Sequence, residues 1–153
     1  MEQVAGAAER LLMDEVVSVS GLFEGSEDIA AARDLARVFL ADAQAVHGLP
    51  VSERAGGAVE LVVSELVTNA RKYATGPCLL TLKIAGGEVE AAVWDSSPTL
   101  PILLAADPTR IGRHGLEIVT ALAQSFSIHR EPVGKRITTR ISLTDDIGPG
   151  SRL

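Results

Sequence analysis

Hydrophobic and polar positions change their period several times along the chain, and each change marks a predicted element. Residues 16–23 are rich in β-branched side chains and predict a strand. Apolar residues then recur with helical spacing over 29–40, with Ser26 as the predicted N-cap. A second, strongly apolar helix is predicted over 59–74, with Ser52 as a further N-cap candidate. The first half of the chain therefore predicts a strand followed by two helices.

The second half of the chain becomes strand-like directly after the second helix. Residues 78–84 and 89–94, which flank a glycine-rich turn, predict a β-hairpin. A short helix over 116–122 and two strands, over 126–129 and 136–143, follow it. Strands that are grouped, with helices between the groups, predict an α+β fold. We expect a two-layer α/β sandwich whose mainly antiparallel sheet is covered by helices on one face.

The length of 153 residues is that of one domain. We expect this domain to span 15–143, preceded by an N-terminal extension over 1–14 and followed by a flexible C-terminal tail over 144–153. Between the hairpin and the short helix, residues 95–112 contain three prolines and predict a long irregular loop. Loops of this length in a compact domain are typical of functional lids.

The charge balance excludes some classes of partner. Lys and Arg number 14 against 20 Asp and Glu, a net charge of −6 that argues against direct nucleic-acid binding. Within 110–140, however, six basic residues stand against two acidic ones, which predicts either an anion site or a solvated face. No apolar run approaches the roughly 20 residues of a membrane span. The single cysteine, Cys78, forms no internal disulfide, so we expect a cytoplasmic protein without membrane contact.

The second predicted helix carries a candidate functional pair. Glu65 and Asn69 are four residues apart and so share one face, which also carries Leu61, Val62 and Leu66. Because that apolar face should pack against the sheet, the polar pair needs partners, which are protein groups, water, or a ligand with a metal. Carboxylate and carboxamide oxygens suit a hard cation such as magnesium. The other interpretation is a satisfied core pair or two helix-surface residues.

Two further positions suit a phosphorylated ligand. Asp95 ends an apolar strand, where its carboxylate either accepts a hydrogen bond from an exocyclic amine or caps the turn at Ser96 and Ser97. The segment Gly112–Leu116 opens a helix, and glycine N–H groups at a helix N-terminus suit a phosphate. Nearby candidate cations are Lys72, Arg110, Arg113, Lys135 and Arg136.

The order of these features resembles that of the Bergerat-fold (GHKL) ATPases, the histidine-kinase-like ATPase domains. Residues 60–70, ELVVSELVTNA, look like the N-box of the branch formed by the anti-sigma-factor serine/threonine kinases. Residues 94–98, WDSSP, are similar to the first glycine box of the family, and residues 112–119 are similar to the second. The resemblance covers 15–143, almost the whole chain.

This resemblance implies ATP and Mg²⁺ as cofactors and gives each candidate residue a role. Glu65 would be the general base that polarises the attacking hydroxyl, and Asn69 would coordinate magnesium. Asp95 would bind the adenine amine, and Lys72 would stand near the phosphates. The residues implied to wrap the phosphates are Gly112, Arg113, His114, Gly115 and Leu116.

The resemblance also implies a function in the regulation of transcription. Kinases of this branch act as anti-sigma factors in partner switching. They phosphorylate an anti-anti-sigma antagonist, which releases a sigma factor, and they are often homodimers. The family's Asp-x-Gly-x-Gly has Ser97 and Thr99 in place of its glycines here, which motivates an alternative: a non-catalytic interaction module of the same fold with a degenerate nucleotide site. Because Glu65 and Asn69 are retained, we favour the kinase.

Overall fold

The structure is a computed structural model that describes residues 17–24, 29–73, 76–97 and 114–145. The predicted extension over 1–14, most of the predicted loop and most of the predicted tail lie outside these residues. Within them, every predicted element is present and in the predicted order.

The described residues form five strands and three helices. In chain order they are β1 (Val17–Phe23), α2 (Ile29–Ala45), α3 (Glu53–Tyr73), β2 (Cys78–Ala85), β3 (Glu88–Asp95), α4 (His114–Leu122), β4 (Ser125–Arg130) and β5 (Lys135–Ser142). The strand ends differ from the predicted ones by at most one residue. None of the three helices is both long and apolar enough to cross a lipid bilayer.

Helix α3 begins at Glu53, well before the predicted start at residue 59. The hydroxyl of Ser52 accepts a hydrogen bond from the backbone N–H of Ala55 at 3.0 Å, which confirms Ser52 as the N-cap. The sequence prediction placed the start too late because Gly56 and Gly57 interrupt the apolar pattern of the first two turns. The cap, rather than the pattern, determines where this helix begins.

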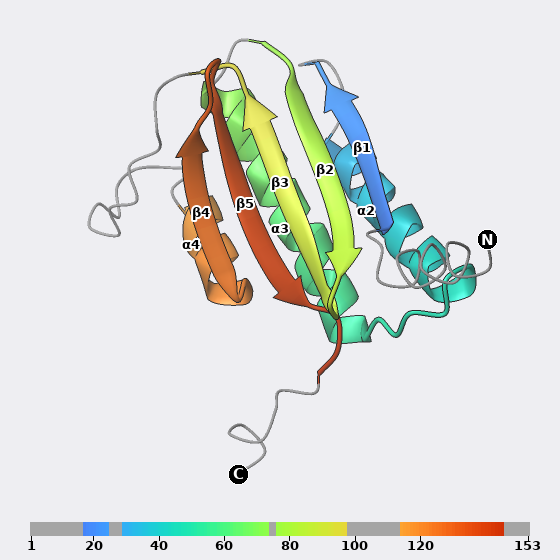
Figure 1. The fold of residues 1–153 in the computed structure, drawn as a ribbon. Helices are drawn as coiled ribbons and strands as arrows, with labels where there is room; N and C mark the ends of the chain where they lie inside the picture. Colours follow the sequence, from blue (N-terminus) through green and yellow to red (C-terminus); the bar gives the residue numbers. More distant parts are fainter. Residues whose placement is uncertain (1–16, 25–28, 74–75, 98–113, 146–153) are drawn as a thin grey trace, which may run out of the picture.

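All five strands pair antiparallel, in the order β1-β2-β3-β5-β4. Figure 1 shows the three helices on one face of this sheet, with α3 crossing behind its centre. The β2–β3 hairpin closes through Gly86 and Gly87, whose φ angles of 60° and 77° suit a two-residue turn. The predicted fold class, an α+β sandwich with helices on one face of an antiparallel sheet, is confirmed.

The core lies between the sheet and α3. Buried and partly exposed residues alternate along β2, so every second side chain faces the helices. Helix α3 faces the sheet with a stripe of fully buried side chains: Val59, Val62, Val63, Leu66 and Val67. This packing holds α3 firmly against the sheet, so the position of its last two turns is fixed relative to the strand ends.

Predicted site residues lie together at one edge of the sheet, where β3 ends and β2 and β5 begin. The register places Cys78, the first residue of β2, opposite Asp95, the last of β3, and Asp95 opposite Lys135, the first of β5. Helix α3 ends just before β2 and therefore reaches the same edge (Figure 1). We call this edge, at the top in Figure 1, the site edge.

Candidate functional site at one edge of the sheet

Glu65 and Asn69 lie one turn apart on α3, but they differ in exposure. Asn69 is buried, with 8% of its surface exposed, whereas Glu65 is half-buried. Leu61, one turn before Glu65, is 41% exposed, while Val62 and Leu66 are fully buried. The expectation that Leu61 packs in the core is therefore wrong, because the stripe through Leu61 and Glu65 lies at the border of the buried face. At this border the Glu65 carboxylate stays accessible while Asn69 is enclosed.

The carboxamide of Asn69 is incompletely satisfied. Its Nδ2 atom is buried and has no hydrogen-bond partner among the described residues. Such atoms are rare, because a buried donor without an acceptor destabilises the protein by about 1–3 kcal/mol. A half-turn of the carboxamide exchanges its nitrogen with its oxygen, so this position offers either a donor to a phosphate oxygen or an oxygen ligand to a metal. Asn69 therefore fits a ligand that contains phosphate and magnesium.

Asp95 is buried to 1% exposure, and its Oδ1 atom accepts two hydrogen bonds. One comes from the backbone N–H of Ser97 at 2.9 Å, which is the turn cap that the sequence allowed as an alternative to ligand binding. The other comes from Nζ of Lys135, also at 2.9 Å, in an ion pair whose two side chains are both 1% exposed. The carboxylate expected to bind the adenine amine is thus already held by a cation from β5.

The alternation along β5 explains why Lys135 is buried. Lys135 shares its side of the strand with Ile137, Thr139 and Ile141, all of them buried, so its side chain enters the layer between sheet and helices. The sequence prediction treated Lys135 as a cation for phosphate and missed its ion pair with Asp95. The signal that could have revealed it was this alternation, which places a lysine in an otherwise uncharged inward row.

Arg136 lies on the opposite side of β5 from Lys135. Its Nε atom is 4.0 Å from a carboxylate oxygen of Glu131, and it stands opposite Trp94 in the register. Because successive residues of a strand point to opposite faces, Lys135 and Arg136 cannot serve one site. The expected role of Arg136 as a phosphate-binding cation stays a prediction, and Arg110 and Arg113 lie outside the described residues.

Two glycines bring neighbouring turns against the backbone at Asp95. At Gly134, where φ is 82°, an added Cβ would overlap the carbonyl oxygen of Asp95 and lie 2.8 Å from Cα of Ser96. At Gly76 an added Cβ would lie 3.1 Å from the hydroxyl of Ser96. The turns that lead into β5 and β2 therefore both pack on the segment that starts at Asp95.

Of the other parts of the predicted site, the end of α3 lies at the site edge and α4 lies further along the sheet (Figure 1). Lys72 is exposed in the last turn of α3. Helix α4 begins at His114, with Gly115 and Leu116 in its first turn, and Figure 1 shows it beside the lower part of β4, below this edge. Its N-terminus is the end that favours anions. The other predicted phosphate-wrapping residues, Gly112 and Arg113, lie outside the described residues.

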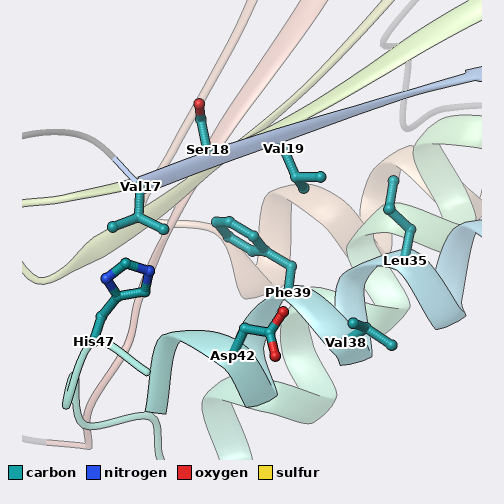
Figure 2. A pocket seen from close by; sticks show the side chains of 8 residues that line it. All are labelled: Val17, Ser18, Val19, Leu35, Val38, Phe39, Asp42 and His47. Atoms are coloured by element: carbon teal, nitrogen blue, oxygen red, sulfur yellow. The ribbon is translucent and has the colours of Figure 1, made fainter. Parts of the chain in front are cut away.

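A separate hollow of about 210 Å³ lies between β1 and α2, away from the site edge. Figure 2 shows its largely apolar lining, with Asp42 and His47 as the charged or titratable side chains among those drawn. Val17, which also lines the hollow, pairs with Ile84 near the hairpin end of β2. None of the predicted site residues lines it, so we place the candidate site at the site edge.

Comparison with known proteins agrees with this geometry. Residues 26–141 match the histidine kinase-like ATPase domain family. Among solved structures, the chain is similar to the RsbU and RsbW domains of Rv1364c from Mycobacterium tuberculosis, with 20% identity and a TM-score of 0.60. That alignment covers 82% of this chain and 32% of the other, so this chain spans about a third of the solved one. The expected GHKL-type ATPase fold is confirmed.

Two histidine kinases show weaker similarity. One is the histidine kinase domain of the blue-light activated histidine kinase of Erythrobacter litoralis EL346, with 21% identity and a TM-score of 0.44 over 59% of this chain and 45% of that one. The other is the histidine kinase AdeS of Acinetobacter baumannii, with 15% identity and a TM-score of 0.48 over 94% and 80%. A comparison with curated proteins gave no match.

Proposed function

Because this chain belongs to the histidine kinase-like ATPase domain family, we propose that it binds ATP with magnesium and phosphorylates a serine or threonine of a partner protein. The observation that carries the proposal is the buried, unsatisfied carboxamide of Asn69, one helical turn from the accessible carboxylate of Glu65. In this proposal Asn69 holds the magnesium ion, and Glu65 accepts the proton of the attacking hydroxyl. Magnesium, when bound, compensates the charge of the phosphates.

The remaining roles follow the arrangement of the site edge. Asp95 is the proposed acceptor for the adenine amine, at the end of β3. Lys72 and the segment Gly112–Leu116 are proposed to bind the phosphates, through an ammonium group and through N–H groups at the N-terminus of α4. Such a site works mainly by positioning and charge stabilisation, which is what phosphoryl transfer requires.

For the partner, we propose an anti-sigma role in partner switching. The N-box-like segment 60–70 supports it, because the segment combines the Glu65 and Asn69 pair with the pattern of the anti-sigma kinases. The proposed substrate is an anti-anti-sigma antagonist, and the second proposed partner is a sigma factor in the cytoplasm. The proposed assembly is a homodimer. The structural similarity to the RsbU and RsbW domains of Rv1364c supports the fold on which this role depends.

Thermal unfolding with and without magnesium and ATP tests the nucleotide site. A ligand at about 100 times its Kd stabilises the native state by about 2.7 kcal/mol. We expect a magnesium-dependent rise in Tm for the wild type and for Thr68→Ala, an exposed neighbour on the same helix, but none for Asn69→Ala. Without nucleotide, Asn69→Ala should remain folded, because the substitution removes a donor that lacks a partner. Unchanged ATP affinity in Asn69→Ala would refute the metal role.

One observation favours a second candidate, the non-catalytic interaction module. Asp95 is engaged by Lys135, and Ser97 and Thr99 replace the two glycines of the first box. A phosphotransfer assay with a candidate antagonist separates the two functions. Transfer of labelled phosphate to the antagonist supports the kinase. A stable complex without labelled serine or threonine supports the interaction module.

A further inference from the structure

We propose that Lys135 sets the nucleotide affinity of this site, because it competes with the base for the carboxylate of Asp95. This inference rests on the proposed function. It assigns Lys135 to the base end of the site, at the start of β5, and not to the phosphate end. It rests on one contact, from Nζ of Lys135 to Oδ1 of Asp95 at 2.9 Å, which weakens what the base gains at this carboxylate.

The carboxylate of Asp95 is well satisfied without a ligand. Its Oδ1 atom receives one neutral donor, the N–H of Ser97, and one charged donor, the ammonium of Lys135. A hydrogen bond from a charged donor is roughly twice as strong as one from a neutral donor. The amino group of adenine is neutral, so it gains less at a carboxylate that an ammonium group already compensates than at an unpaired one.

Lys135 is poorly placed to release Asp95. Among the described residues, Asp95 is its one ion-pair partner, and both side chains are 1% exposed. A buried ammonium group that loses its counter-charge retains the full desolvation penalty, which makes breaking such a pair strongly unfavourable. The ion pair occupies Oδ1 and compensates the charge of this carboxylate, so the net gain from an adenine amine that binds Oδ2 is small.

Asn69 and Asp95 differ in how far their own hydrogen bonding is satisfied without a ligand. At the phosphate end of the site, the Asn69 carboxamide is buried with an unsatisfied atom, so a ligand improves its hydrogen bonding. At the base end, Oδ1 of Asp95 is already held by Lys135 and Ser97, so a ligand meets a carboxylate whose charge is compensated. We therefore expect phosphate and magnesium to supply most of the binding energy and the base to supply little.

The test compares ATP with purine riboside triphosphate, which lacks the exocyclic amine, by isothermal titration calorimetry in the presence of magnesium. We expect the wild type to prefer ATP by less than about threefold. Lys135→Thr keeps a hydroxyl donor for Asp95 but opens space beside it. This variant should bind ATP about tenfold more tightly than the wild type and prefer ATP over the analogue by about tenfold.

Lys83→Thr is the matched control. Lys83 also forms an ion pair from a strand of the sheet, at 3.3 Å to Glu90, but its side chain is 44% exposed. Because Lys83 alternates with the inward-facing residues of β2, it projects from the other face of the sheet. Its replacement should leave both nucleotide affinities at their wild-type values.

The outcomes separate this inference from the proposed function. If the wild type binds ATP and a folded Lys135→Thr binds it equally or less tightly, the competition is disproved and the ATP site stands. If neither protein binds either nucleotide, the inference and the proposed function both fail. If Lys135→Thr does not fold, the two affinities of the wild type test the inference. A tenfold preference for ATP over purine riboside triphosphate would disprove it, because Asp95 would then bind the amine despite Lys135.

Discussion

Strand β3 carries two ion-pair clusters that differ in burial. At the site edge, Asp95 and Lys135 form a pair in which both side chains are 1% exposed. Nearer the hairpin, Glu90 contacts Lys83 at 3.3 Å and Arg140 at 3.4 Å, and these two basic side chains are 44% and 55% exposed. Burial changes the effect of such a pair. An exposed pair contributes about 0–1 kcal/mol, whereas removing one partner of a buried pair costs about 3–5 kcal/mol.

This difference in burial also distinguishes the two faces of the sheet. Asp95 and Lys135 lie within the layer that otherwise holds apolar side chains, where Asn69 also carries its unsatisfied carboxamide. Polar groups in such a layer reduce stability unless they have partners. The buried polar groups Asn69, Asp95 and Lys135 therefore distinguish the candidate site from the Glu90 cluster, which is an ordinary charged surface. Three substitutions test this contrast.

The largest effect should come from Gly134→Ala. The new Cβ would overlap the backbone at Asp95, in a residue whose φ of 82° is already unfavourable for alanine. Because backbone atoms cannot move aside as a flexible side chain does, we expect a loss of about 4 kcal/mol or more in the free energy of unfolding, measured by urea denaturation.

Gly87→Ala is the matched control for this prediction. Gly87 has a similar φ of 77°, but an added Cβ there meets no atom within 4 Å. Its cost should be the backbone strain alone, about 1–2 kcal/mol. Equal losses in the two variants would show that the packing of Gly134 on Asp95 has no energetic importance.

The next effect concerns Asp95→Asn, which leaves the ammonium of Lys135 buried without a counter-charge. We expect this variant to lose about 3–4 kcal/mol in the free energy of unfolding. The double variant Asp95→Asn with Lys135→Met removes both charges while keeping similar shapes, so it should recover much of that loss. A double variant that is no more stable than Asp95→Asn would mean that the loss arises from something other than the unpaired charge.

Local sequence signals predicted most of the fold. Alternation identified the strands, and the glycine pair at Gly86 and Gly87 identified the hairpin turn. The start of α3 was misplaced because Gly56 and Gly57 hid the first turns, although the cap at Ser52 was recognised. These signals are local, so they predict well the helices, strands and turns that are determined by residues close together in the sequence.

The part of the candidate site that depends on residues close in sequence was also predictable. The spacing of Glu65 and Asn69 on one helix follows from the helical period, so their proximity was visible in the sequence. The pairing of Asp95 with Lys135 joins residues 40 positions apart and depends on the register of β3 with β5. No local pattern contains that register, whereas the alternation along β5, which is local, already places Lys135 and Arg136 on opposite faces.

The smallest effect should come from Glu90→Gln, and its dependence on salt completes the comparison. The substitution removes the charge that faces Lys83 and Arg140, and we expect a loss of about 0–1 kcal/mol at low ionic strength. At 1 M salt the Debye length falls to about 3 Å, so this loss should disappear. The loss caused by Asp95→Asn should persist at 1 M salt, because ions do not reach a pair that is 1% exposed. Urea denaturation of both variants at two salt concentrations measures the difference, and a loss in Asp95→Asn that vanishes with salt would show that its ion pair is open to solvent.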